Sequence, residues 1–152
     1  MKIAIKGIYH ERTEDAPFIG ALVCATSCNF NCLGCINEPL KYSASYYMYD
    51  YDIIKEIKTN PFNQGIVLGG LEWSLQIEEM KQLVNLAIKK QLQVMIYTGL
   101  DEYDFLKICP NIKNIKCYVK YGRYLEKLSV NDYRNYGVKL ASSNQKIIKY
   151  GE

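Results

Sequence analysis

Three closely spaced cysteines are the residues of this sequence whose type and spacing point most directly to chemistry. Cys28, Cys32 and Cys35 form a C-x3-C-x2-C pattern within the segment CNFNCLGC. Crowded thiols without a secretory signal are typical of metal binding or redox chemistry. A structural zinc ion normally takes four protein ligands, and a 4Fe-4S cluster has four corners that are commonly held by four thiolates. Three cysteines would leave one iron of such a cluster without a protein ligand.

An iron without a protein ligand could bind the amino and carboxylate groups of a small molecule. If that molecule is S-adenosylmethionine, the cluster can pass one electron to its sulfonium. The carbon–sulfur bond then breaks to give methionine and a 5′-deoxyadenosyl radical. Two other interpretations stay open, namely a zinc site completed by Cys24 or His10 and a set of unliganded core cysteines. The spacing favours iron–sulfur over zinc, and the polar Asn29 and Asn31 argue against a buried core strand.

The other three cysteines are expected to have packing roles. Cys24 lies in the apolar stretch IGALVCA, which predicts a buried position in a strand. Cys109 and Cys117 have no histidine or second cysteine beside them, so they are interpreted as core or surface thiols. His10 is the only histidine, and we expect it to be an ordinary surface residue.

Alternating strands and helices must position the cysteine loop. Buried strands are predicted at 18–25, 65–68, 92–97 and 115–120, with a lead-in strand at 1–8 and a final strand at 145–150. Helices are predicted through DIIKEIKTN, capped by Asp50 or Asp52, over 76–90, capped by Ser74, and near 101–108. This order predicts an α/β fold with a mainly parallel sheet and crossover helices.

In such a fold, ligands collect at the carboxyl ends of the strands. The cysteine loop, the Gly69-Gly70 turn and Thr98-Gly99 each follow a predicted strand directly. We therefore expect all three to lie at one edge of the sheet.

The composition indicates one globular domain spanning residues 1–152, because 49% of the residues are hydrophobic and 23% are charged. The net charge of +3 excludes a strongly basic nucleic-acid module. The apolar runs are shorter than a membrane span, and the start of the chain becomes charged before a signal-peptide core could form. The expectation is a soluble cytoplasmic protein that binds neither nucleic acid nor membrane.

The sequence also resembles a known superfamily. The C-x3-C-x2-C loop after the first buried strand is similar to that of the radical S-adenosylmethionine superfamily. Within it, ALVCATSCNFNCLGCIN resembles the cluster loop of the activating proteins of anaerobic ribonucleotide reductases, including Gly34 and Asn37. VMIYTG, VKYGRYLEKL and SSNQKII also resemble stretches of those proteins, in matching order from about residue 18 to 149.

The resemblance implies a shortened, partial (β/α) barrel of the radical S-adenosylmethionine type. It implies a 4Fe-4S cluster on Cys28, Cys32 and Cys35 with S-adenosylmethionine on the open iron. Backbone around Gly34 and Ile36 would lie near that ligand. Gly69 and Gly70 match the glycine pair whose backbone approaches the methionine amino group, where the absence of a Cβ leaves room.

The implied substrate is a protein, namely an anaerobic ribonucleotide reductase on which a glycyl radical is generated. An electron donor such as a flavodoxin or ferredoxin would supply the electron. No catalytic acid–base side chain is expected, because the hydrogen transfer is homolytic. The alternatives are another radical S-adenosylmethionine enzyme, acting on a small molecule or a different glycyl radical enzyme, and a non-enzymatic metal-stabilised interaction domain.

One departure concerns the residue after the glycine pair. The family usually places an acidic or similar residue there, whereas this chain has Leu71, followed by Glu72 and Trp73. Glu72 either reaches the amino group through a shifted turn or caps the next helix. Trp73 is expected to pack, and Thr98 to end its strand.

Two further features of the sequence are candidates for the site or its surroundings. Asn144 and Gln145 are site candidates without a derived role. The tyrosine-rich stretch at 42–51 is interpreted either as a docking surface or as a partly exposed loop and helix start that covers the cluster.

Overall fold

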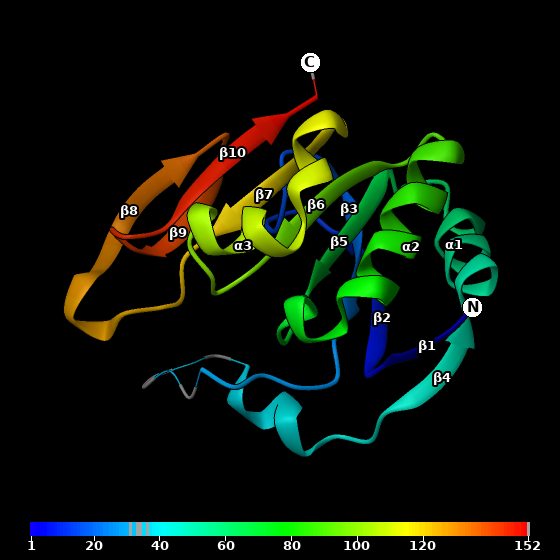
Figure 1. The fold of residues 1–152 in the computed structure, drawn as a ribbon, viewed down its shortest axis with the longest axis horizontal. Helices are drawn as coiled ribbons and strands as arrows, with labels where there is room; N and C mark the ends of the chain where they lie inside the picture. The colour runs from blue at the N-terminus through cyan, green and yellow to red at the C-terminus, as the bar shows by residue number, and fades with distance from the viewer. Residues whose placement is uncertain (31, 33–34, 36, 152) are drawn as a thin grey trace.

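A six-stranded sheet forms the centre of the computed structural model, which describes residues 1–30, 32, 35 and 37–151. The strand order is β10-β7-β6-β5-β3-β2, and the four inner strands run parallel. The inner strands are β3 (Gly20–Cys24), β5 (Gly65–Gly69), β6 (Gln93–Tyr97) and β7 (Cys117–Tyr121). The outer strands, β2 (Gly7–Arg12) and β10 (Lys146–Tyr150), are antiparallel to their neighbours. The predicted mainly parallel α/β sheet is confirmed (Figure 1).

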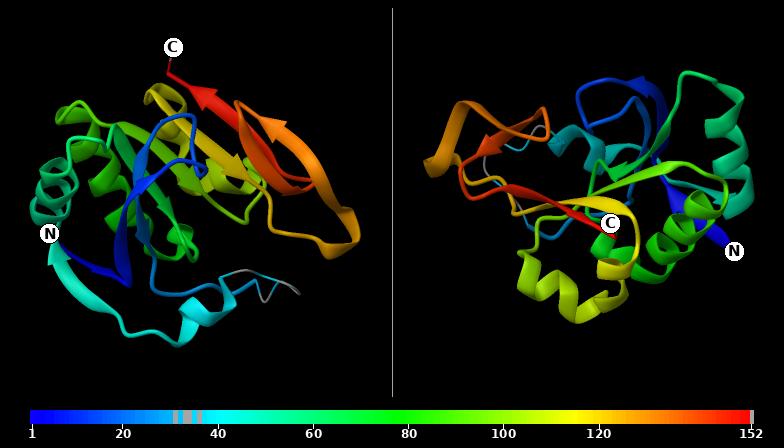
Figure 2. Two further views of the ribbon diagram at one scale, coloured as in Figure 1. Left: turned by 180° about the vertical axis from the view of Figure 1, so that it is seen from behind. Right: turned by 90° about the horizontal axis from the view of Figure 1, so that it is seen from above.

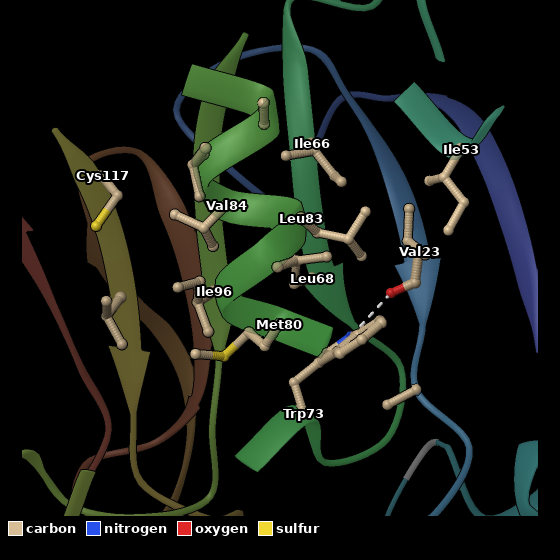
Figure 3. Close-up of a cluster of buried hydrophobic side chains, with 14 of the residues drawn as sticks. Val23, Ile53, Ile66, Leu68, Trp73, Met80, Leu83, Val84, Ile96 and Cys117 are labelled. Carbon is tan, nitrogen blue, oxygen red and sulfur yellow. Dashed lines mark hydrogen bonds between the residues drawn. The ribbon is translucent and has the colours of Figure 1, made fainter. Parts of the chain in front are cut away.

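Three helices pack on one face of this sheet (Figures 1 and 2). They are α1 (Asp50–Thr59), α2 (Ile77–Lys89) and α3 (Glu102–Ile108). Successive strand residues point to opposite faces, so Ile66 and Leu68 pack with the helices while Val67 packs on the other side. Figure 3 shows Met80 and Leu83 of α2 within the helix-side core.

The helices begin differently from the prediction. Tyr49 is the N-cap of α1 and makes no side-chain cap bond, so capping by Asp50 or Asp52 is wrong. The Asp50 carboxylate instead accepts a hydrogen bond from the backbone N–H of Tyr51 at 2.8 Å. A 3-10 turn, η2 (Trp73–Gln76), precedes α2, and Glu72 is the N-cap of this turn. The N-cap of α2 is Gln76, which makes no side-chain cap bond, so the predicted capping by Ser74 is wrong.

A β-hairpin for which the sequence gives little signal packs on the second face of the sheet. It consists of β8 (Ser129–Asn135) and β9 (Val138–Ser142), joined at Tyr136 and Gly137, which both have positive φ. Two such residues form the turn that suits a two-residue hairpin. Tyrosine is a rare residue at positive φ, and β8 contains few apolar residues, so the sequence signal was weak.

A separate two-stranded sheet pairs β1 (Lys2–Ile5) with β4 (Tyr46–Tyr49). The predicted lead-in strand at 1–8 is therefore divided at Lys6, with β1 in this small sheet and β2 at the edge of the large one. The tyrosine-rich stretch supplies β4 and the start of α1.

Short 3-10 turns complete the described elements. They are η1 (Glu38–Tyr42), η3 (Pro110–Asn114) and η4 (Glu126–Leu128). In the described part of the chain, every helix falls short of the length and apolar character needed to cross a membrane. The predicted closure of the sheet into a partial barrel stays a prediction.

Candidate functional site

The cysteine loop, the Gly69-Gly70 turn and Thr98-Gly99 lie together at the carboxyl ends of β3, β5 and β6. The backbone N–H of Ala25, just after β3, donates to the carbonyl of Gly69 at 3.1 Å. The N–H of Glu72 donates to the carbonyl of Ser27 at 2.8 Å, which fixes the turn after β5 against the start of the cysteine loop. The expectation that these segments share one edge of the sheet is confirmed, and Figure 1 shows the described part of the loop running along that edge.

Glu72 links the turn after β5 to the end of β6. Its side chain is buried, with the residue only 3% exposed. One carboxylate oxygen, Oε1, accepts from the N–H of Gly99 at 2.6 Å. The other, Oε2, accepts from the hydroxyl of Thr98 at 2.9 Å and from the N–H of Ser74 at 3.0 Å. Glu72 is therefore a capping residue, but of the 3-10 turn η2 and not of α2, whose N-cap is Gln76. Its carboxylate also holds two strand ends together.

Thr98 therefore does more than end its strand. Its hydroxyl donates to Glu72 and accepts from the N–H of Leu100 at 3.1 Å. Trp73, which is fully buried, donates from Nε1 to the carbonyl of Val23 at 3.1 Å, so its predicted packing role is confirmed (Figure 3).

Gly70 occupies a position that few other residues could take. Its φ is +79°, and a Cβ placed there would lie 2.7 Å from both Cβ and Sγ of Cys24. Cys24 is buried in β3, as predicted, and burial raises the pKa of its thiol to about 11. Because this thiol stays protonated at neutral pH, its role in the structure is packing against the glycine turn.

The cysteine loop packs against the end of β6 through Phe30. A Cβ at Gly99 would lie 2.7 Å from the Phe30 ring, so the close approach depends on glycine at this position. Cys28, Cys32 and Cys35 are free thiols of intermediate burial on this loop. Burial raises the pKa of Cys28, while a hydrogen bond from the Phe30 backbone opposes the shift. Partly accessible thiols at the edge where α/β folds commonly bind ligands are suited to holding a cluster.

The described residues do not by themselves form a preassembled metal site. Among residues 1–30, 32, 35 and 37–151, no three Cys, His, Asp or Glu side chains are close enough together to hold a metal ion. Gly34 and Ile36, which the resemblance places near the ligand, lie outside the described residues. The backbone N–H of Cys35 donates to the carbonyl of Cys32 at 3.2 Å, which draws the second and third cysteines into one turn.

Lys6 anchors the chain that follows the cysteines, a role that sequence analysis missed. Its ammonium donates to the carbonyls of Leu40 at 2.9 Å and of Lys41 and Ser43 at 2.8 Å each. These carbonyls lie at the end of η1, where a cation is favoured. The signal in the sequence is a lysine inside the apolar segment MKIAIKGI, where an unpaired charge would be costly.

A cavity of about 800 Å³ adjoins the cysteine loop. Phe30 and Cys32 line one side, and residues 123–128 line the other. Asn144 donates to the carbonyl of Arg123 at 2.9 Å, and Gln145 donates to that of Gly122 at 3.1 Å. The role of these two polar candidates in the structure is thus to hold the segment that forms the cavity wall.

The remaining cysteines and the histidine lie apart from this edge. Cys109 and Cys117 are buried in the helix-side core, which confirms a packing role, and burial raises the pKa of Cys117 to about 12. His10 is half-exposed, with Nδ1 2.8 Å from the side-chain nitrogen of Asn63 and Nε2 3.8 Å from Glu56.

Comparison with known proteins identifies the family. No curated protein gave a significant match. A family model described as a 4Fe-4S single cluster domain matches residues 19–148, from just before β3 to within β10. The matched region includes the cysteine loop, the glycine turn and the cavity wall. The chain therefore belongs to the 4Fe-4S single cluster domain family.

Proposed function

We propose that this protein is a radical S-adenosylmethionine activase that generates a glycyl radical on an anaerobic ribonucleotide reductase. The observation that carries the proposal is the position of the three-cysteine loop, which is fastened to the glycine turn by the bond from Glu72 to Ser27 at 2.8 Å. Membership in a 4Fe-4S single cluster family supports the cluster itself.

Cys28, Cys32 and Cys35 would hold the cluster and leave one iron for S-adenosylmethionine. When bound, the cluster and S-adenosylmethionine would supply a one-electron cleavage that yields methionine and a 5′-deoxyadenosyl radical able to take a hydrogen atom from a glycine Cα. The protein contributes position and exclusion of water, since a homolytic transfer needs no acid–base side chain. The half-buried thiols on a loop held by Phe30 and Lys6 suit that role.

Gly69 and Gly70 would bring backbone close to the methionine amino group. Glu72 already accepts three hydrogen bonds from protein groups. A direct contact between its carboxylate and the amino group would use a remaining lone pair on Oε1, which has a single protein partner. Glu72 therefore contributes to the ligand site chiefly by fixing the turn. Gly34 and Ile36 keep their proposed place beside the ligand.

The cavity beside Cys32 would admit the glycine-bearing segment of the reductase. Its second wall carries Arg123, Tyr124 and Lys127, which offer cationic and aromatic contacts to a folded partner. An electron donor such as a flavodoxin or ferredoxin would supply the electron.

The test is radical formation on a purified anaerobic reductase. The reconstituted protein, dithionite and S-adenosylmethionine are mixed with the reductase under anaerobic conditions. The proposal predicts a glycyl doublet in the electron paramagnetic resonance spectrum and stoichiometric 5′-deoxyadenosine. The same reductase should give the doublet with a known activase, as a positive control. If this protein then cleaves S-adenosylmethionine without producing the doublet, anaerobic ribonucleotide reductases are rejected as its substrate.

A matched pair of variants separates binding from chemistry in the same assay. Lys127→Ala changes the cavity wall without touching the cysteine loop. We expect it to weaken the apparent affinity for the reductase while leaving the slow cleavage of S-adenosylmethionine unchanged. Lys89→Ala, an exposed residue of α2 on the helical face, should change neither property.

A further inference from the structure

Strand β4 has one unpaired edge in the part of the chain that the structure describes. It pairs with β1 alone, in a sheet of two strands. Figures 1 and 2 both show β4 on the outside of the molecule, with β1 on its inner side. An unpaired strand edge is a ready template for another strand.

The backbone groups that face this edge follow from the contacts of Ala4. Its N–H donates to Glu79 Oε2 at 3.1 Å and its carbonyl accepts from Gln76 Nε2 at 2.8 Å, so both point away from β4. Ala4 lies opposite Tyr47. In an antiparallel ladder, opposed residues alternate between bonded and non-bonded pairs, so Ala4 and Tyr47 form a non-bonded pair. Tyr47 therefore directs its own N–H and carbonyl outward.

A second contact gives the same alternation independently. The N–H of Asp50 donates to the carbonyl of Met1 at 3.0 Å, which makes these two residues a bonded pair. The next pair, Lys2 and Tyr49, is then non-bonded. The N–H of Tyr49 also faces outward, two residues along the strand from Tyr47.

The side chains beside this edge lack the usual protection. No charged residue occurs from Tyr42 to Tyr49, and no proline interrupts β4. Tyr47 is 71% exposed, and Tyr46 and Tyr49 are 44% and 41% exposed. Natural proteins blunt free edges with charges, prolines or covering segments. An uncharged edge with exposed aromatic rings is therefore expected to be covered by another strand.

We propose that β4 pairs with β4 of a second copy of this chain, antiparallel across a two-fold axis at Tyr47. In this register Tyr47 faces the partner's Tyr47, and Tyr49 faces the partner's Ser45. A symmetric pairing requires a self-complementary strand, and this strand brings no like charges together. Pairing would also extend the two-stranded sheet to four strands in the order β1-β4-β4-β1, which is favourable because an isolated two-stranded sheet is marginal in water.

Sedimentation equilibrium of the 152-residue chain tests this interface. Tyr47→Pro removes the outward N–H without touching the bonds to β1. We expect a reversible dimer for the unaltered chain and dimerisation at least about tenfold weaker for Tyr47→Pro, which loses two symmetry-related donors. Tyr103→Ala is the matched control, because Tyr103 is also 71% exposed but lies on α3, away from β4. This variant should leave the dimer unchanged. A monomer at all concentrations, or a Tyr47→Pro dimer of undiminished strength, overturns the proposal.

Disulfide trapping tests the register and does not depend on the proline variant. Directly opposed bonded residues have Cα atoms about 5.5 Å apart, which a disulfide can span. After mild oxidation, Tyr47→Cys should run as a covalent dimer on a non-reducing denaturing gel. The amount of covalent dimer formed by Tyr103→Cys should equal that of the unaltered chain. Absence of a Tyr47→Cys dimer rejects the two-fold at this residue. A Tyr47→Cys chain that cross-links only to an added reductase would assign the edge to a different protein and reject self-pairing.

Discussion

The carboxylate of Glu72 accepts a hydrogen bond of 2.6 Å from the backbone N–H of Gly99, across the ends of two neighbouring strands. Two further donors, Thr98 and Ser74, satisfy its other oxygen. A buried carboxylate with three donors is a strong local restraint, because bonds to a charged group are stronger than neutral ones. This one residue holds the glycine turn, the end of β6 and the start of η2 in register.

Glu72→Gln should destabilise the protein by about 2–3 kcal/mol. The amide nitrogen cannot accept hydrogen bonds, so at least one of the three donors loses its buried partner. Urea unfolding followed by circular dichroism measures the change. Glu78→Gln is the matched control, since Glu78 is exposed at the start of α2 and forms an exposed ion pair with Lys81 at 3.4 Å. Its effect should stay within about 0.5 kcal/mol, and an equal loss for both variants would contradict the role of Glu72.

Gly70→Ala should cost more than Gly137→Ala, although both glycines have a φ near +79°, at +79° and +78°. The added methyl at Gly137 meets nothing within 4 Å, so only the backbone strain of about 1 kcal/mol applies there. At Gly70 the methyl also meets Cys24 at 2.7 Å, and we expect a total loss of at least about 2 kcal/mol. Thermal unfolding of both variants compares the two losses, and equal values would show that the turn relaxes freely.

Lys6→Met should loosen the chain that follows the cysteines. The variant keeps the apolar stem and removes the ammonium from the carbonyls of Leu40, Lys41 and Ser43. Hydrogen exchange of the amides in η1 should become at least about tenfold faster, while exchange in α2 stays unchanged. Uniformly faster exchange throughout the chain would indicate general destabilisation instead of a local anchor.

Lys120→Met should stabilise the protein at pH 7. The ammonium of Lys120 lies 4.5 Å from the ring centre of Tyr97, and burial lowers the pKa of Lys120 to about 8 from its ordinary 10.5. The folded state therefore binds this proton more weakly than the unfolded state. Stability contributed by this site rises with pH between about 8 and 10.5 and is lost as the pH falls through that window.

Urea unfolding at pH 7 and at pH 10.5 measures the effect of Lys120→Met. The expected gain is about 2 kcal/mol at pH 7 and clearly smaller at pH 10.5. Lys116→Met, at an exposed position just before β7, should show no such dependence on pH. A gain for Lys120→Met that is the same at both pH values would contradict the titration as its cause.

Alanine variants distinguish the proposed cluster ligands from the cysteines that pack in the core. Alanine at Cys28, Cys32 or Cys35 should each abolish the 4Fe-4S absorbance after anaerobic reconstitution, because a cluster held at two corners is not retained. Cys109→Ala removes a thiol from the core and should keep full iron and sulfide content. Full loading of Cys32→Ala would exclude Cys32 as a ligand.

Strands β3, β5 and β6 could be predicted from the sequence because each contains a short apolar run, as expected of strands that are largely buried on both faces. Strand β7 instead alternates between buried and half-buried residues. The shared position of the cysteine loop, the glycine turn and Thr98-Gly99 at one edge could also be predicted, because each follows a strand of a parallel sheet. The β8–β9 hairpin could not, since its turn uses a tyrosine at positive φ and β8 is mainly polar. A lysine inside an apolar segment indicates that Lys6 needs a partner, but the carbonyls that it binds lie more than thirty residues away and could not be identified from the local pattern.

At the site itself, the hydrogen-bond partners of Glu72 could not be predicted from the sequence. The sequence left capping and ligand contact equally open, because both need a carboxylate just after the glycine pair. Only the folded chain brings Thr98 and Gly99, twenty-six and twenty-seven residues later, to the same carboxylate. Long-range partners of this kind depend on strand order and register, which the residue pattern around Glu72 does not contain.

The most direct test of the proposed chemistry is electron paramagnetic resonance of the reduced, anaerobically reconstituted protein with and without S-adenosylmethionine. The proposal predicts a 4Fe-4S signal whose shape changes when S-adenosylmethionine is added, because the ligand binds the iron that no cysteine holds. A cluster signal that is indifferent to S-adenosylmethionine would contradict the open iron and with it the proposed activase.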